Sequence, residues 1–171
     1  MAKLQFPNAP QRREFLDLDS RNIVISYIIS GIFWLIIGSI LAIMASFKLH
    51  WPQFLDGASY LTFGRVRPLH LNTMVYGWAS MTGSGVALWI LMRVLRVTIP
   101  YKGVLYFSVV LWNICLAIGS VQLLAGFTHG LEWLEFPFSS AVGILLSILI
   151  ITFVVLMMLF NRATESLYIS V

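Results

Sequence analysis

Four long stretches of the chain contain no lysine, arginine, aspartate or glutamate, and this pattern limits the possible folds more than any other feature. They cover residues 23–47, 69–92, 104–127 and 138–160, and each exceeds the roughly 20 residues that a helix needs to cross a bilayer. Apolar residues make up 59% of the sequence, and the mean hydropathy is +0.88. Because backbone in lipid must satisfy its own hydrogen bonds, all four stretches are predicted to be helices. The predicted fold class is therefore all-α, a polytopic membrane bundle with four transmembrane helices.

The distribution of charge predicts the orientation of this bundle. Residues 1–22 are predicted to form a polar cytoplasmic tail in which Asp19 or Ser20 caps the first helix, residues 23–160 the four-helix transmembrane segment, and residues 161–171 a cytoplasmic connector. Of the 11 lysines and arginines, all except Lys48, Arg65 and Arg67 lie in the tail, the second loop or the connector. By the positive-inside rule both termini are cytoplasmic. This topology accounts for the net charge of +4 without a nucleic-acid partner.

One histidine, His70, opens the second stretch, directly after Arg65, Arg67 and a proline. An imidazole just inside a membrane needs a partner, and haem iron with anionic propionates would suit the histidine and both arginines. The alternative is a histidine that is hydrogen-bonded to a neighbouring helix, and the spacing leaves both interpretations open. The other histidines, His50 and His129, lie in outer loops, where neither is well placed to be a second axial ligand.

A set of residues at helical spacing begins at His70. They are His70, Met74, Gly77, Met81 and Ser84. A regular α-helix would place them on one stripe, where Gly77 would let a flat macrocycle lie close to the backbone. The small residues of this span favour close packing between helices instead, so the glycine alone does not decide between a cofactor and a neighbouring helix.

Two acidic residues, Glu132 and Glu135, lie just before the fourth stretch. Three residues apart on a helical turn, they would point the same way, toward the outer side where the arginines and His70 lie. Carboxylates there suit Ca²⁺, which prefers hard oxygen ligands, or could pair with the arginines. The plain alternative is two solvated loop acids.

One run of the sequence, residues 62–72 (TFGRVRPLHLN), resembles the second-helix motif of the catalytic subunit of cbb3-type cytochrome c oxidases, the C family of haem-copper oxidases. The Trp51-Pro52 pair and the segment Glu132-Trp133-Leu134-Glu135, with Pro137 after it, fit the same family. The acidic segment also resembles bacterial nitric oxide reductases, which are close relatives. The resemblance covers nearly the whole chain and implies the amino-terminal part of a haem-copper oxidase fold.

The resemblance implies a role for each candidate residue. His70 falls on the axial ligand of low-spin haem b, and Arg67 falls beside the haem propionates. Glu132 falls on a carboxylate associated with a calcium ion that bridges the propionates of two haems, and Glu135 on a neighbouring acid. In the family, the second haem b ligand and the ligands of the high-spin haem and copper lie on later spans. Residues 161–171 would lead toward a fifth helix.

The function that this resemblance implies is electron input into a terminal respiratory oxidase. Such an enzyme takes electrons from cytochrome c through haem b, reduces oxygen to water at a haem-copper site and pumps protons. The implied partners are the remainder of the catalytic subunit, cytochrome c-type haem subunits and lipid, in a bacterial inner membrane. The alternatives are a nitric oxide reductase segment, and a non-catalytic membrane scaffold in which His70 serves only helix packing.

Overall fold

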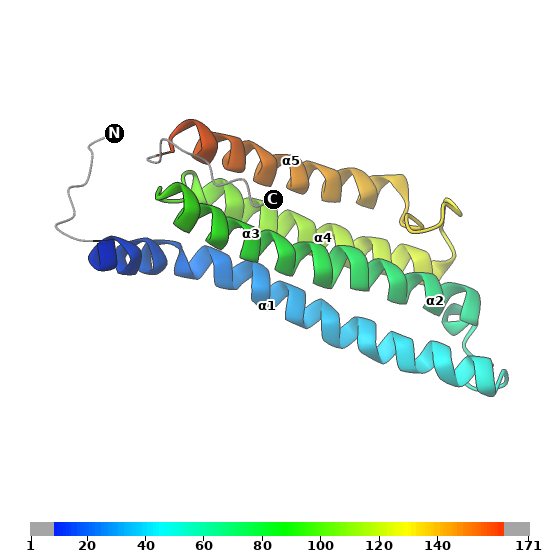
Figure 1. Cartoon of the computed structure of the whole chain (residues 1–171). Coiled ribbons are helices and arrows are strands. Elements are labelled where there is room, and N and C mark those ends of the chain that lie inside the picture. The colour runs from blue at the N-terminus through cyan, green and yellow to red at the C-terminus, as the bar shows by residue number, and fades with distance from the viewer. Residues whose placement is uncertain (1–8, 163–171) are drawn as a thin grey trace.

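Four long helices lie side by side in the computed structural model of the chain, which describes residues 9–162 (Figure 1). Helix α1 is Ala9–His50, α4 is Lys102–Ala125 and α5 is Phe138–Phe160. The second membrane helix runs over Phe63–Leu95 and has three parts: α2 (Phe63–Asn72), the π-helical segment η2 (Thr73–Ala79) and α3 (Ser80–Leu95). A short 3₁₀ turn, η1 (Ser59–Leu61), precedes it. All four helices are long and apolar enough to cross a membrane, which confirms the predicted fold class.

The first helix begins earlier than predicted. Residues 9–22 belong to α1, so the helix starts before the predicted boundary at residue 23, while residues 1–8 lie outside the described residues. Neither predicted cap acts as one, because Ser20 donates from Oγ to the carbonyl oxygen of Leu16 (2.9 Å) and Asp19 forms a salt bridge with Lys102. Since Asp17 also pairs with Arg93, ion pairs join this end of α1 to the neighbouring helices. Residues 163–171 of the predicted connector are likewise outside the described part.

The second membrane helix also starts earlier than the uncharged stretch did, at Phe63 rather than residue 69. Arg65 and Arg67 lie in its first turns, and Pro68 follows them inside the helix. A search for charge-free segments stops at such arginines, whereas a helix that begins at the membrane surface can carry them on its first turns.

Polar hydrogen bonds between α1 and α4 supplement the apolar packing of the bundle. The hydroxyls of Tyr27 and Ser108 lie 3.0 Å apart, and Trp34 donates from Nε1 to Oδ1 of Asn113 at 2.8 Å. Because lipid tails are as apolar as the side chains that face them, close packing and such hydrogen bonds hold membrane helices together. Exposed apolar side chains such as Ile29, Phe107 and Leu149 cover the outer faces, as lipid contact requires.

Candidate functional site

The imidazole of His70 is held by a backbone carbonyl of the neighbouring helix. His70 lies in the last turn of α2, is half-buried, and has its Nδ1 atom 2.9 Å from the carbonyl oxygen of Gly38 on α1. A carbonyl only accepts, so Nδ1 carries the proton and donates it. In the neutral form of imidazole this leaves the free lone pair on Nε2, which has no hydrogen-bond partner in the part of the chain that the structure describes. A carbonyl-bound Nδ1 and an available Nε2 form the arrangement typical of metal-ligating histidines.

Gly38 makes this close approach possible. A Cβ atom at residue 38 would lie 2.7 Å from Sδ of Met74 and 3.1 Å from Oγ1 of Thr73, both on the second membrane helix. Real Cβ atoms are not found at the shorter of these distances. A larger residue at position 38 would therefore displace the Met74 side chain, one turn after His70.

The predicted stripe of the second membrane helix is confirmed only in its first half. Met74 and Gly77 face α1 with His70, but a Cβ on Gly77 would lie 2.6 Å from Cβ of Trp34. The space beside Gly77 is thus filled by a side chain of α1, and the prediction that a macrocycle lies against this glycine is wrong. Beyond Gly77 the residues that face α1 are Thr82, beside Gly31, and Gly85, beside Tyr27. These two contacts fall one residue after the predicted positions Met81 and Ser84, although Met81 is fully buried in the bundle.

The two arginines before His70 have different surroundings. Arg65 is half-buried and donates from Nη1 to the carbonyl oxygen of Leu124 at 2.8 Å, so it satisfies the end of α4. Arg67 is exposed and forms no salt bridge within residues 9–162. Arg67 therefore has the more accessible guanidinium for an external anion, and it lies one turn before His70.

The two glutamates do not share a helical turn, so that prediction is wrong. The loop bends back on itself between Leu131 and Leu134, and Trp133 takes a left-handed conformation with φ of +69°. Glu132 is exposed, whereas Glu135 is half-buried and accepts a hydrogen bond from Nδ2 of Asn72. Between residues 9 and 162 neither acid pairs with an arginine.

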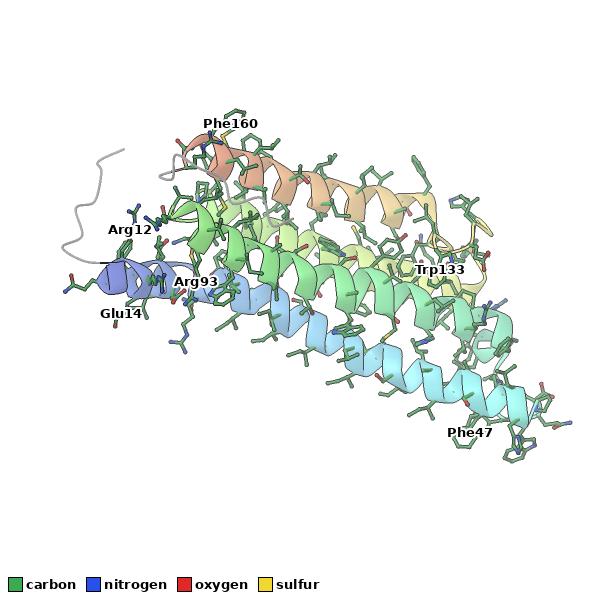
Figure 2. All side chains as sticks on the ribbon, in the orientation of Figure 1. Arg12, Glu14, Phe47, Arg93, Trp133 and Phe160 are labelled. Carbon is green, nitrogen blue, oxygen red and sulfur yellow. The ribbon has the colours of Figure 1, made fainter. Side chains whose placement is uncertain are left out.

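No group of three or more histidine, cysteine, aspartate or glutamate residues within 9–162 is placed to hold a metal ion. Glu132 would thus need further ligands from elsewhere to bind calcium. The loop histidine His129 has a different role, because its Nε2 accepts from the backbone N–H of Phe138 at 2.8 Å, at the start of α5. His129 and the loop of Trp133 lie at the opposite end of the bundle from Arg93, as Figure 2 shows for the two labelled residues.

Sequence reasoning missed two residues of this site, Gly38 and Asn72. Asn72 is buried and joins Glu135 to the second membrane helix, donating also to the carbonyl oxygen of Pro68 at 2.8 Å. A polar residue in an apolar span two positions after the histidine was an available signal for Asn72. For Gly38 the signal was weaker, namely its spacing of two helical turns from Gly31.

Comparison with known proteins identifies the family. The family model for cytochrome c and quinol oxidase polypeptide I matches residues 22–171. A cbb3-type cytochrome c oxidase subunit, CcoN1, from Stutzerimonas stutzeri is 23% identical over 152 residues, which cover 88% of this chain and 32% of that protein. A cytochrome c oxidase subunit 1 homolog from Agrobacterium tumefaciens is 24% identical over 113 residues, covering 66% of this chain and 21% of that protein. The chain thus spans a third or less of the length of these relatives, and it belongs to the cytochrome c and quinol oxidase polypeptide I family.

Proposed function

We propose that the chain is the amino-terminal part of the catalytic subunit of a cbb3-type terminal respiratory oxidase, and that His70 is an axial ligand of its low-spin haem b. Membership of the polypeptide I family and similarity to a cbb3-type subunit support the enzyme class. The bond between His70 and Gly38 supports the ligand, since it fixes the tautomer that leaves Nε2 free. The same bond would satisfy a histidine with a packing role alone, so the available Nε2 is what distinguishes a ligand.

Arg67 is proposed to compensate the haem propionates. Its guanidinium is exposed, has no acidic partner in the described part of the chain and lies one turn before His70. Arginine suits such a role because it stays charged and can donate two parallel hydrogen bonds to a carboxylate. Arg65 is less suited to this role, because it is half-buried and uses one N–H on the carbonyl oxygen at the end of α4.

Glu132 is proposed to contribute to a calcium site near the same propionates. A bare carboxylate beside propionates would be repelled, so Glu132 can act there only through a cation. Its exposed position in the loop after α4 leaves its oxygens accessible. The other ligands would come from the propionates and from the rest of the subunit.

When bound, haem b would supply one-electron transfer from cytochrome c toward a high-spin haem and copper in the rest of the subunit, where oxygen would be reduced to water with proton pumping. The residues of this chain bind and orient: His70 holds the iron, the Gly38 carbonyl fixes the ring, and Arg67 offsets negative charge. The proposed location is a bacterial inner membrane with both termini in the cytoplasm, alongside cytochrome c-type haem subunits.

The decisive experiment is His70→Ala in the assembled oxidase, read by the reduced-minus-oxidised absorption spectrum and by haem content. We expect loss of the low-spin haem b band, because the iron loses an axial bond. His50→Ala is the control, since His50 is an exposed histidine at the end of α1. An unchanged low-spin band with normal haem content in the His70 variant would overturn the assignment. Metal analysis then separates the oxidase, which contains copper, from a nitric oxide reductase, which would contain non-haem iron instead.

A further inference from the structure

We propose that the π-helical segment η2 (Thr73–Ala79) rotates His70 into its ligating position. The inference rests on the proposed haem-binding role of His70 and concerns how the second membrane helix achieves it. The segment begins three residues after the histidine and ends where α3 begins. Single π-helical turns inside α-helices are rare and occur frequently at functional sites.

The hydrogen bonds of the segment show that one extra residue is accommodated. The backbone N–H of Ser80 donates to the carbonyl oxygen of Val75, five residues earlier instead of the usual four. The Ser80 hydroxyl donates to the same carbonyl at 2.8 Å. Thr73, at the other end, donates from Oγ1 to the carbonyl oxygens of Leu69 and His70, both at 2.9 Å. Two hydroxyls therefore stabilise the carbonyls at the ends of the wide turn.

The contacts with α1 define which residues must share one face. Gly31 and Gly38 lie two turns apart on α1, so they face the same way. Thr82 packs at Gly31, and His70 bonds to Gly38. His70 and Thr82 must therefore lie on the same side of the second membrane helix.

A regular α-helix would not meet this condition. Twelve residues separate His70 from Thr82, and at about 100° per residue they would lie about 120° apart around the helix axis. When one residue is absorbed by the wide turn, the separation corresponds to eleven α-helical residues and falls to about 20°. The wide turn thus explains why the stripe moves from Met81 and Ser84 to Thr82 and Gly85.

This geometry predicts that removing and adding a residue have opposite effects. Deleting Ala79, an exposed residue at the end of η2, should convert the segment to a regular α-helix and leave His70 and Thr82 on one side. Inserting an alanine after Ala79 should rotate His70 about 100° away from Gly38. Deletion of Ala87 is the matched control, because it removes an exposed alanine from the regular helix α3.

The experiment compares these three variants in the assembled oxidase, measuring the low-spin haem b band and its electron paramagnetic resonance signal per assembled complex. We expect the Ala79 deletion to keep both at the parent level and the insertion to lose them. The Ala87 deletion leaves the spacing between His70 and Thr82 unchanged, so it measures what a deletion in the regular helix costs in assembly. Loss in the Ala79 deletion, including failure to assemble, or retention in the insertion would overturn the inference. If the His70→Ala variant keeps its low-spin haem b, the ligand assignment itself fails. If the His70→Ala variant loses this haem while the Ala79 deletion and the alanine insertion give the same result as each other, only the role of the π segment fails.

Discussion

The side-chain amide of Asn72 donates a hydrogen bond to the carboxylate of Glu135, 63 positions later in the sequence. Asn72 is buried and follows His70 by two residues. One turn further on, the Tyr76 hydroxyl donates to the carbonyl oxygen of Trp133 at 2.8 Å. The loop between α4 and α5 is thus attached at two points to the helix that carries the proposed haem ligand.

Glu135→Leu should destabilise the assembled protein by about 1–3 kcal/mol, because the buried amide of Asn72 loses an acceptor. Glu135→Gln keeps a side-chain carbonyl oxygen at this place and should lose less. The difference in stability between the two variants is measured by thermal unfolding, with haem release as the signal. Asp56→Leu, at an exposed acid of the loop after α1, is the control and should leave stability unchanged. Equal stabilities for Glu135→Leu and Glu135→Gln would show that the bond contributes nothing.

Arg65→Ala and Arg67→Ala should have different effects. The first leaves the Leu124 carbonyl without its donor and should lower thermal stability by about 1–3 kcal/mol. The second should leave stability unchanged and lower the midpoint potential of haem b, since loss of a nearby positive charge disfavours the reduced state. Thermal melts and potentiometric titrations of both variants check this. A lowered potential in Arg65→Ala with none in Arg67→Ala would reverse the assignment.

Gly77→Ala should destabilise the bundle by about 1–3 kcal/mol, because the added methyl group meets the Trp34 side chain. Gly83→Ala is the matched control on the same helix, since a Cβ there meets no atom within 4 Å. This control should be neutral or slightly stabilising, as alanine favours helix over glycine. Thermal inactivation of the two variants compares them directly. Equal inactivation would indicate that Trp34 moves aside at little cost.

The outer loop after α1 should be accessible from outside the cell. A cysteine at Ser59 should react with an impermeant thiol reagent in intact cells, whereas one at Thr98, exposed in the loop between α3 and α4, should react only after permeabilisation. The parent chain has one cysteine, Cys115, which is buried and serves as the background. The opposite labelling pattern would invert the topology.

Glu132→Gln should weaken binding of calcium at the proposed site. Chelation of the parent oxidase should reproduce the effect of the substitution on haem potential, and chelator should add almost nothing to the variant. Redox titration with and without chelator, together with calcium analysis, measures both. Unchanged metal content, potential and turnover in Glu132→Gln would identify Glu132 as a solvated loop residue.

The spans could be predicted from the sequence because each of the four crossings needs a long uncharged core. The beginning of α1 could not, because the charged residues before residue 23 indicated a polar tail, and the partners of Asp17 and Asp19, which are Arg93 and Lys102, lie far along the chain. An analysis of hydrophobic periodicity also assumes the same number of residues per turn along the whole helix, so it could not show the wide turn at residues 73–79.

For the candidate site, the sequence predicted which residues take part better than it predicted the contacts that they make. His70 and Arg67 were identified by residue type and by the resemblance of residues 62–72. Their different environments depend on partners distant in sequence, such as Gly38 for His70 and Leu124 for Arg65. Likewise, the loop conformation at Trp133 decides which glutamate reaches Asn72, and no spacing rule for helices applies to it.

The ion pairs at the other end of the bundle also set an order of events during synthesis. Asp17 precedes Arg93 by 76 residues, and Asp19 precedes Lys102 by 83. When α1 first enters the membrane, neither carboxylate has its partner, because those cations have not yet been translated. The two pairs can therefore close only after the second membrane helix and the loop that follows it have been synthesised, so this end of α1 is joined to its neighbours later than it is made.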